Sequence, residues 1–189
     1  HSVVRRQRQM CIRDSIPGSL SVIDLDDLRD EGSIDLKSIT RYEPGISVFD
    51  PRNVNYGGST STGNLNIRGM RQNRILFMQD NIRLPAGFYG VGYDYSNANT
   101  VDFYTLNTID ILKGPASSLY GSDALGGVVS FNTLTVDDLL EDGENFNFEI
   151  PFKYNSANES VSGAGRLAYR DEESGLSYLA ILGKSESKE

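Results

Sequence analysis

Hydrophobic and polar residues alternate most regularly in the last quarter of the chain. From Phe146 to Tyr154 every second residue is apolar, and the residues between them are polar or proline. A similar alternation runs over 161–170, and a third candidate strand begins at Leu176. A period of two predicts strands with one apolar face. A run of about ten residues is the length of a tilted bilayer-crossing strand, but an ordinary soluble hairpin gives the same pattern.

The preceding part of the chain interleaves short apolar runs with turn residues. Short strands that alternate with short helices predict a compact α+β domain over residues 16–133. Helices are expected after the cap residue Asp24 as far as residue 30, over 35–42, and over 115–120, where Pro115 suits the first position and Gly121 a left-handed end. Loops are expected over 50–63 and 85–100. The expected strands cover 18–23, 46–49, 64–69, 74–78, 82–84, 109–113 and 126–131.

The first residues differ in character from the rest. The run Arg5–Asp14 reads as the translation of a transposase adapter used to prepare sequencing libraries, and no apolar stretch follows it as in a signal peptide. We therefore treat residues 1–15 as an adapter artefact. Residues 1–14 hold four arginines and one aspartate, so the remaining chain has 14 basic and 25 acidic residues and its net charge changes from −8 to −11.

This composition excludes several classes of function. Without His1 and Cys11 no histidine or cysteine remains for a zinc site, a disulfide or a His-dependent triad. The acidic balance argues against nucleic-acid binding. A phosphate-binding loop ending at Gly183 fails because Tyr178 stands where its first glycine belongs, and a dinucleotide loop fails at Tyr95. We expect no enzyme and no intrinsic cofactor or metal, and no apolar run of 18 residues predicts a transmembrane helix.

Three stretches resemble the motifs of one family. The stretch Ile109–Phe131 closely resembles the plug signature of TonB-dependent receptors, and Asn66–Gly69 and Ile75–Asp80 resemble two further plug motifs in the same order. One departure is Asn81 after Asp80, where the family more often has Asp-Gly. Three motifs in sequence make the resemblance specific.

The resemblance implies a domain organisation. Residues 16–133 would form an α+β plug, a small mixed sheet with short helices. Residues 134–144 would be an acidic connector, and 145–189 the first antiparallel strands of an incomplete transmembrane β-barrel. Such receptors form a barrel of about 22 strands in the Gram-negative outer membrane, and the plug lies in its lumen facing the periplasm. A TonB-type energy-transducing protein contacts a box N-terminal to the plug, where this sequence has the adapter-like residues instead.

The resemblance also implies a transported ligand. Residues 121–129 are most similar to receptors for haem, haemoglobin and transferrin, so haem or iron from a haemoprotein is the expected cargo. A ferric siderophore is one alternative. A soluble plug-like periplasmic binding module is another, and the apolar row after residue 145 argues against it.

Two groups of candidate site residues follow. Glycines of the signature permit tight turns and close packing, and Arg68 and Lys113 at strand ends are expected to pair with carboxylates on the barrel wall. Aromatic residues in the loops are expected to contact the ligand, since tyrosinate can ligate haem iron and aromatic rings also line siderophore pockets. The signature and barrel-contact group is Arg68, Gly69, Lys113, Gly114, Tyr120, Gly121, Gly126 and Gly127. The ligand-binding group is Tyr56, Phe88, Tyr89, Tyr93 and Tyr95.

Overall fold

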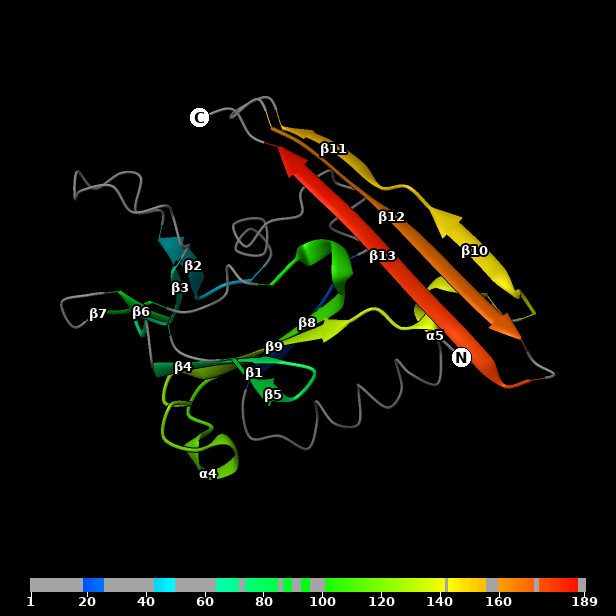
Figure 1. Ribbon diagram of the computed structural model, residues 1–189. Helices are drawn as coiled ribbons and strands as arrows, with labels where there is room; N and C mark the ends of the chain where they lie inside the picture. The colour runs from blue at the N-terminus through cyan, green and yellow to red at the C-terminus, as the bar shows by residue number, and fades with distance from the viewer. Residues whose placement is uncertain are drawn as a thin grey trace. The chain divides into compact units, whose positions relative to one another are not determined.

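The computed structural model of the protein consists of two compact units, residues 1–133 and 134–189. Figure 1 shows the strands and helices of both units. The structure describes residues 19–25, 43–49, 64–71, 74–84, 87–89, 93–95, 101–141, 143–155, 160–171 and 174–186. Of the helix expected over 25–30, only Leu25 is described. The helix expected over 35–42, the loop over 50–63 and the adapter-like residues 1–15 lie outside the described residues.

The first unit is built on a five-stranded mixed sheet in the order β1-β8-β9-β4-β5. The β4–β9 pair is parallel, and the other three pairs are antiparallel. The strands lie close to the expected ones. Strand β8 begins earlier than expected, because Leu106 pairs with Thr133 of β9 and Asn107 is buried. Their bounds are β1 Ser19–Asp24, β4 Ile75–Gln79, β5 Ile82–Arg83, β8 Leu106–Lys113 and β9 Gly127–Thr133.

Two short antiparallel pairs accompany this sheet. Strand β2 (Ile46–Phe49) pairs with β3 (Asn64–Ile67), as the apolar runs predict. Strand β6 (Gly87–Tyr89) pairs with β7 (Tyr93–Tyr95). The expectation of a continuous loop over 85–100 is therefore wrong. Strands of three residues are too short for their periodicity to stand out in a stretch rich in glycine, tyrosine and asparagine.

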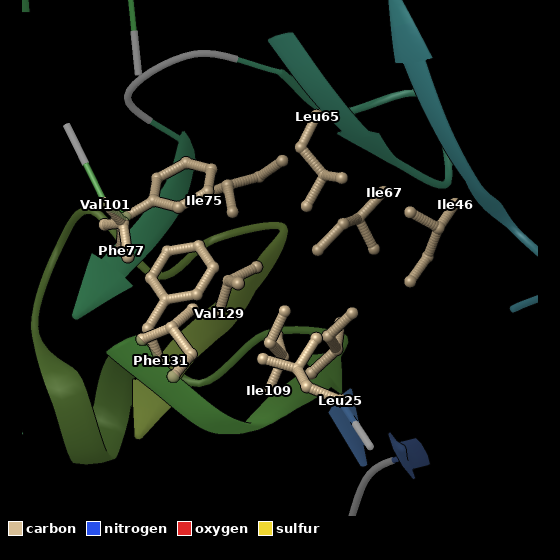
Figure 2. Packing of buried hydrophobic residues seen from close by; sticks show 12 residues of the cluster. Leu25, Ile46, Leu65, Ile67, Ile75, Phe77, Val101, Ile109, Val129 and Phe131 are labelled. Carbon is tan, nitrogen blue, oxygen red and sulfur yellow. The ribbon is translucent and has the colours of Figure 1, made fainter. Parts of the chain in front are cut away.

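Apolar side chains cover both faces of the main sheet. On one face, Phe77 and Phe131 stack with ring centroids 6.4 Å apart and pack with residues of β2 and β3 (Figure 2). The opposite face carries a smaller cluster that includes Leu76, Leu112 and Val128. Burial on both faces explains why β4 and β9 read as continuous apolar runs rather than as alternating ones.

The turn that joins β8 to β9 contains a short helix, α4 (Ser117–Tyr120), as expected. Its start differs from the expectation, because Ala116 is the cap residue and Pro115 precedes it. Gly121 ends the helix with φ +92° and ψ −176°, which is not the left-handed helical conformation expected there. This region of backbone space is open essentially to glycine alone. A glycine is therefore needed at position 121, as expected, although for a different backbone conformation.

The second unit is a meander of long antiparallel strands. Strands β10 (Phe146–Glu149) and β11 (Phe152–Asn155) both pair with one edge of β12 (Ser160–Asp171), in one uninterrupted register, and β13 (Leu176–Glu186) pairs with the other edge. The break between β10 and β11 falls at Pro151. Its carbonyl accepts the amide of Ala164 at 3.0 Å, but proline has no N–H to return the bond.

The expected acidic connector contains a helix, which the sequence analysis missed. Helix α5 (Val136–Leu139) begins with a capping box in which Thr135 and Asp138 bond each other's backbone. Leu139 and Leu140 of this segment pack with Ala168 of β12. Arg170 of β12 forms an ion pair with Asp137. The helix is thereby fixed against the strands of its own unit.

The two faces of this second sheet differ in exposure. Ala164, Arg166 and Ala168 alternate along β12 on the buried face. The residues that alternate with these three along β12, together with their partners on the neighbouring strands, form an apolar face that is exposed in the chain as described. This exposed face carries Phe146, Phe148, Phe152, Tyr154, Val161, Tyr169 and Tyr178.

None of the helices in the described part of the chain has the length and apolar character needed to cross a membrane.

Candidate functional site

The signature segment folds as a closed turn at the end of β8. Gly114, with φ +139°, leaves the strand after Lys113. Its amide donates to the carbonyl of Gly126 at 3.2 Å, and the amide of Ala116 donates to the carbonyl of Ala124 at 2.9 Å. These two bonds close the neck of the segment, so α4 projects from the sheet on a rigid base.

Among the glycines that the structure describes, Gly126 and Gly127 leave the least room for a side chain. A Cβ added at Gly127 would lie 2.4 Å from the carbonyl oxygen of Leu112 and 3.0 Å from the side chain of Ile67. One at Gly126 would lie 2.7 Å from the Cβ of Met70. The glycine pair therefore lets β9 start directly beside β8 and against the turn that follows β3, as the sequence analysis expected of these positions.

Arg83 holds the outer part of the segment. Its guanidinium donates to the carbonyl oxygen of Tyr120 at 2.9 Å and forms an ion pair with Asp123. A Cβ at Gly121 would lie 3.2 Å from the same guanidinium. Sequence reasoning did not single out Arg83, because 37 and 40 residues separate it from these partners.

Lys113 is buried, with 7% of its side chain exposed. Its Nζ lies 2.8 Å from Oε2 of Glu43, and the hydroxyl of Ser21 donates to the same oxygen at 2.6 Å. The carboxylate that Lys113 contacts in the described residues thus belongs to its own unit. The sequence analysis expected Lys113 to pair with a carboxylate on the barrel wall. In the described residues it pairs with Glu43 instead, because the fold brings the turn at Glu43 beside the end of β8.

Arg68 and Gly69 form the tip of a tight turn. Both have positive φ, +50° and +89°, and Ile67 and Met70 exchange two backbone hydrogen bonds across them at 3.0 and 2.9 Å. This is the pattern of a type I′ turn, whose first central position usually holds Asn, Asp or Gly. Arg68 is an exposed residue, and it forms no ion pair with another of the described residues.

A second turn of this kind explains the departure noted in the sequence. Asp80 and Asn81 have φ +49° and +66° and connect β4 to β5. Asp and Asn adopt positive φ at low cost, so they replace Asp-Gly. The carboxylate of Asp80 also accepts the amide and the hydroxyl of Thr133, each at 2.9 Å.

One carboxylate lies half-buried within the sheet. Asp110 of β8 accepts a hydrogen bond of 2.9 Å from Asn132, which also donates to Thr108. The other oxygen of Asp110 is buried and has no hydrogen-bond partner in the part of the chain described. Burial raises the pKa of Asp110 above its ordinary value of 3.8, and the bond from Asn132 opposes this shift only in part.

The expected ligand-contacting residues are only partly placed. Phe88 and Tyr89 lie on β6, and Tyr93 and Tyr95 lie on β7, where Tyr89 pairs with Tyr93. Their backbones therefore share one hairpin. Tyr56 lies outside the described residues. The described residues contain no group of three or more His, Cys, Asp or Glu side chains that could hold a metal ion.

A family model described as TonB-dependent Receptor Plug Domain matches residues 13–128. The chain therefore belongs to the TonB-dependent receptor plug family, as its three motifs predict.

Three curated relatives are similar to more than two thirds of this chain. Lactoferrin-binding protein A of Neisseria meningitidis serogroup B is 30% identical over 139 residues, which are 69% of this chain and 14% of that protein. Transferrin-binding protein A of Haemophilus influenzae is 30% identical over 167 residues, 84% of this chain and 17% of the other. A hemin receptor of Yersinia enterocolitica is 30% identical over 134 residues, 71% and 18% of the two. The predicted likeness to the haem and transferrin branch is confirmed.

Solved structures agree on the fold. The FrpB iron transporter of Neisseria meningitidis (F3-3 variant) matches 90% of this chain and 24% of its own with a TM-score of 0.70 at 20% identity. The siderophore receptor PirA of Acinetobacter baumannii matches 93% and 25% with a TM-score of 0.67 at 22% identity. At such identities the likeness concerns the fold alone. The chain spans between about a seventh and a fifth of the length of the curated relatives named above.

Proposed function

We propose that this chain is the plug and the first wall strands of an outer-membrane receptor that takes up iron from haem or a haemoprotein in a Gram-negative bacterium. The observation that carries the proposal is the set of relatives at 30% identity, which are named for lactoferrin, transferrin and hemin. The preference for haem, haemoglobin or transferrin receptors over siderophore receptors rests on residues 121–129. A ferric siderophore is the alternative cargo, in keeping with the fold it shares with a siderophore receptor.

The second unit supports a place in the membrane. Phe146, Tyr169 and Tyr178 lie opposite one another across three strands, and Phe148 lies opposite Leu167 in the next matching row. A row of this kind, 52–57% exposed at Phe146, Phe148 and Tyr178, is costly in water and stable against lipid. This observation favours a receptor over a soluble plug-like module.

Within the proposal, Phe88, Tyr89, Tyr93 and Tyr95 of the β6–β7 hairpin contact the ligand, and Tyr56 does so as well. Arg68 pairs with a carboxylate on the barrel wall. Its exposure and its strained, left-handed backbone conformation support this role. Tyr120 and the signature glycines hold the plug surface in shape. A TonB-type protein supplies the energy from the periplasmic side.

The test is growth of a receptor-deficient Gram-negative strain under iron limitation, carrying the receptor that contains this chain. We expect growth on haem or haemoglobin and none in a matched strain without TonB. Growth on ferric siderophores alone would establish the alternative cargo. Growth on no iron source, with the receptor present in the outer membrane, would overturn the proposal. Replacing Tyr89, Tyr93 and Tyr95 by Phe, which keeps the rings, tests the tyrosine hydroxyls separately.

A further inference from the structure

Strand β1 lies at an edge of the main sheet. Its described neighbour is β8, with which it pairs in a continuous antiparallel register from Ser19 to Asp24. Edge strands separate from a sheet more easily than central ones because only one side is bonded. Ser21, in the middle of β1, is nevertheless buried, and its hydroxyl reaches outside the sheet to Glu43 at 2.6 Å.

Glu43 is held by two donors at one oxygen atom. Ser21 donates from β1 and Lys113 from the end of β8, at 2.6 and 2.8 Å. Since hydrogen bonds to a charged acceptor are stronger than neutral ones, the two donors fix the position of this carboxylate. Glu43 begins the turn 43–45 that leads into β2, and its carbonyl accepts the amide of Ile46 at 3.3 Å.

The same turn holds the backbone of Arg68. The carbonyl of Gly45 accepts the amide of Arg68 at 2.8 Å, and Arg68 has the left-handed φ of +50°. For an arginine this conformation costs on the order of 1 kcal/mol, so contacts with its surroundings have to offset that cost. The 43–45 turn is one of the contacts that do so.

We propose that Ser21, Glu43 and the 43–45 turn form a relay that couples the docking of β1 to the conformation of the Arg68–Gly69 turn. When β1 leaves the sheet, Glu43 loses one of its two donors and water reaches the Lys113 pair. The turn 43–45 then loosens, and the bond from Gly45 that enforces the strained conformation of Arg68 weakens. An event at the edge of the sheet thus changes how Arg68 presents its guanidinium. This coupling is a property of the first unit and does not depend on which ligand the receptor takes up.

The test uses hydrogen exchange, followed by mass spectrometry, on the full 189-residue chain. Ser21→Thr and Ser21→Val are matched in shape and differ in the hydroxyl. We expect exchange in residues 19–25 and 64–71 to be on the order of tenfold faster in the Val variant than in the Thr variant, from the loss of one bond to a charged acceptor. Exchange in the central strand, 127–133, should be the same in both.

The pair Ser19→Thr and Ser19→Val is the control, since Ser19 is exposed on the same strand. It should show no difference in residues 64–71. Ser21→Ala is the second variant, which removes the hydroxyl without adding volume. Equal exchange in 64–71 with and without the hydroxyl would overturn the relay. Equal acceleration of all three segments would also overturn it, since it would mean global opening.

Discussion

The two units place their apolar residues in different patterns along the strands, continuous runs in the first and strict alternation in the second. In the first, apolar side chains fill both faces of a small sheet, and the buried Lys113 is paired with Glu43. In the second, one face of long strands is buried around Ala168, while the aromatic residues lie on the face that is exposed. The comparison teaches that an aromatic row marks the core in one sheet and an outer surface in the other. In the first sheet both faces are covered, so its aromatic residues are buried. In the second sheet only one face is covered, so the aromatic residues on the other face are exposed.

The strongest test of the comparison is to add a Cβ in each unit. Gly127→Ala meets the backbone of Leu112 at 2.4 Å and has φ +156°, so clash and strain together should cost about 4–6 kcal/mol. Gly165→Ala in the second unit has nothing within 4 Å and should change stability by less than about 0.5 kcal/mol. Urea unfolding of both variants measures this. Equal effects would show that the packing argument is wrong.

Next in size is the buried ion pair. Lys113→Met or Glu43→Leu alone leaves a charge without its partner and should cost about 3–5 kcal/mol in unfolding free energy. The double variant removes both charges and should recover most of that loss. A double-mutant cycle by chemical denaturation checks the coupling. If the single losses simply add, the pair does not interact as its 2.8 Å separation implies.

A smaller effect is expected at Asp110, and it depends on pH. Its pKa is raised in the folded state, so the folded chain binds the proton more tightly than the unfolded chain. Stability is therefore lost as the pH rises from the ordinary value near 3.8 through the raised pKa. Asp110→Asn should be more stable than the natural chain at pH 7 and should approach it near pH 3. Parallel stability profiles across this range would contradict the assignment.

The smallest effect in water is expected on the exposed aromatic face. Phe148→Asn should change the unfolding free energy by less than about 0.5 kcal/mol, since Phe148 contributes little to a core. Partition of the chain into lipid vesicles should fall at the same time. Phe131→Asn, at a position with 0% exposure, is the contrast and should unfold the first unit. A large loss of stability in water from Phe148→Asn would identify that face as a core.

Much of this could be predicted from the residues, and the remainder could not for physical reasons. The main strands and the signature turn were predicted because alternation and glycines act locally. The partners of Lys113 and of Arg83 were not, because Glu43 and Asp123 lie 70 and 40 residues away and only the fold brings them together. Helix α5 was missed although Thr135 and Asp138 have the spacing of a capping box, because its four residues sit in an acidic run.

The turn at Asp80 and Asn81 predicts which residues natural receptors tolerate at these two positions. Asp80 and Asn81 both adopt the positive φ that the turn requires, but only Asp80 also accepts hydrogen bonds from Thr133. Glycine in place of Asn81 would restore the commoner Asp-Gly pair at no conformational cost. Glycine in place of Asp80 would keep the turn but lose both hydrogen bonds to Thr133, the last residue of β9. Two adjacent positions with the same backbone geometry should therefore differ sharply in how freely they vary among natural receptors.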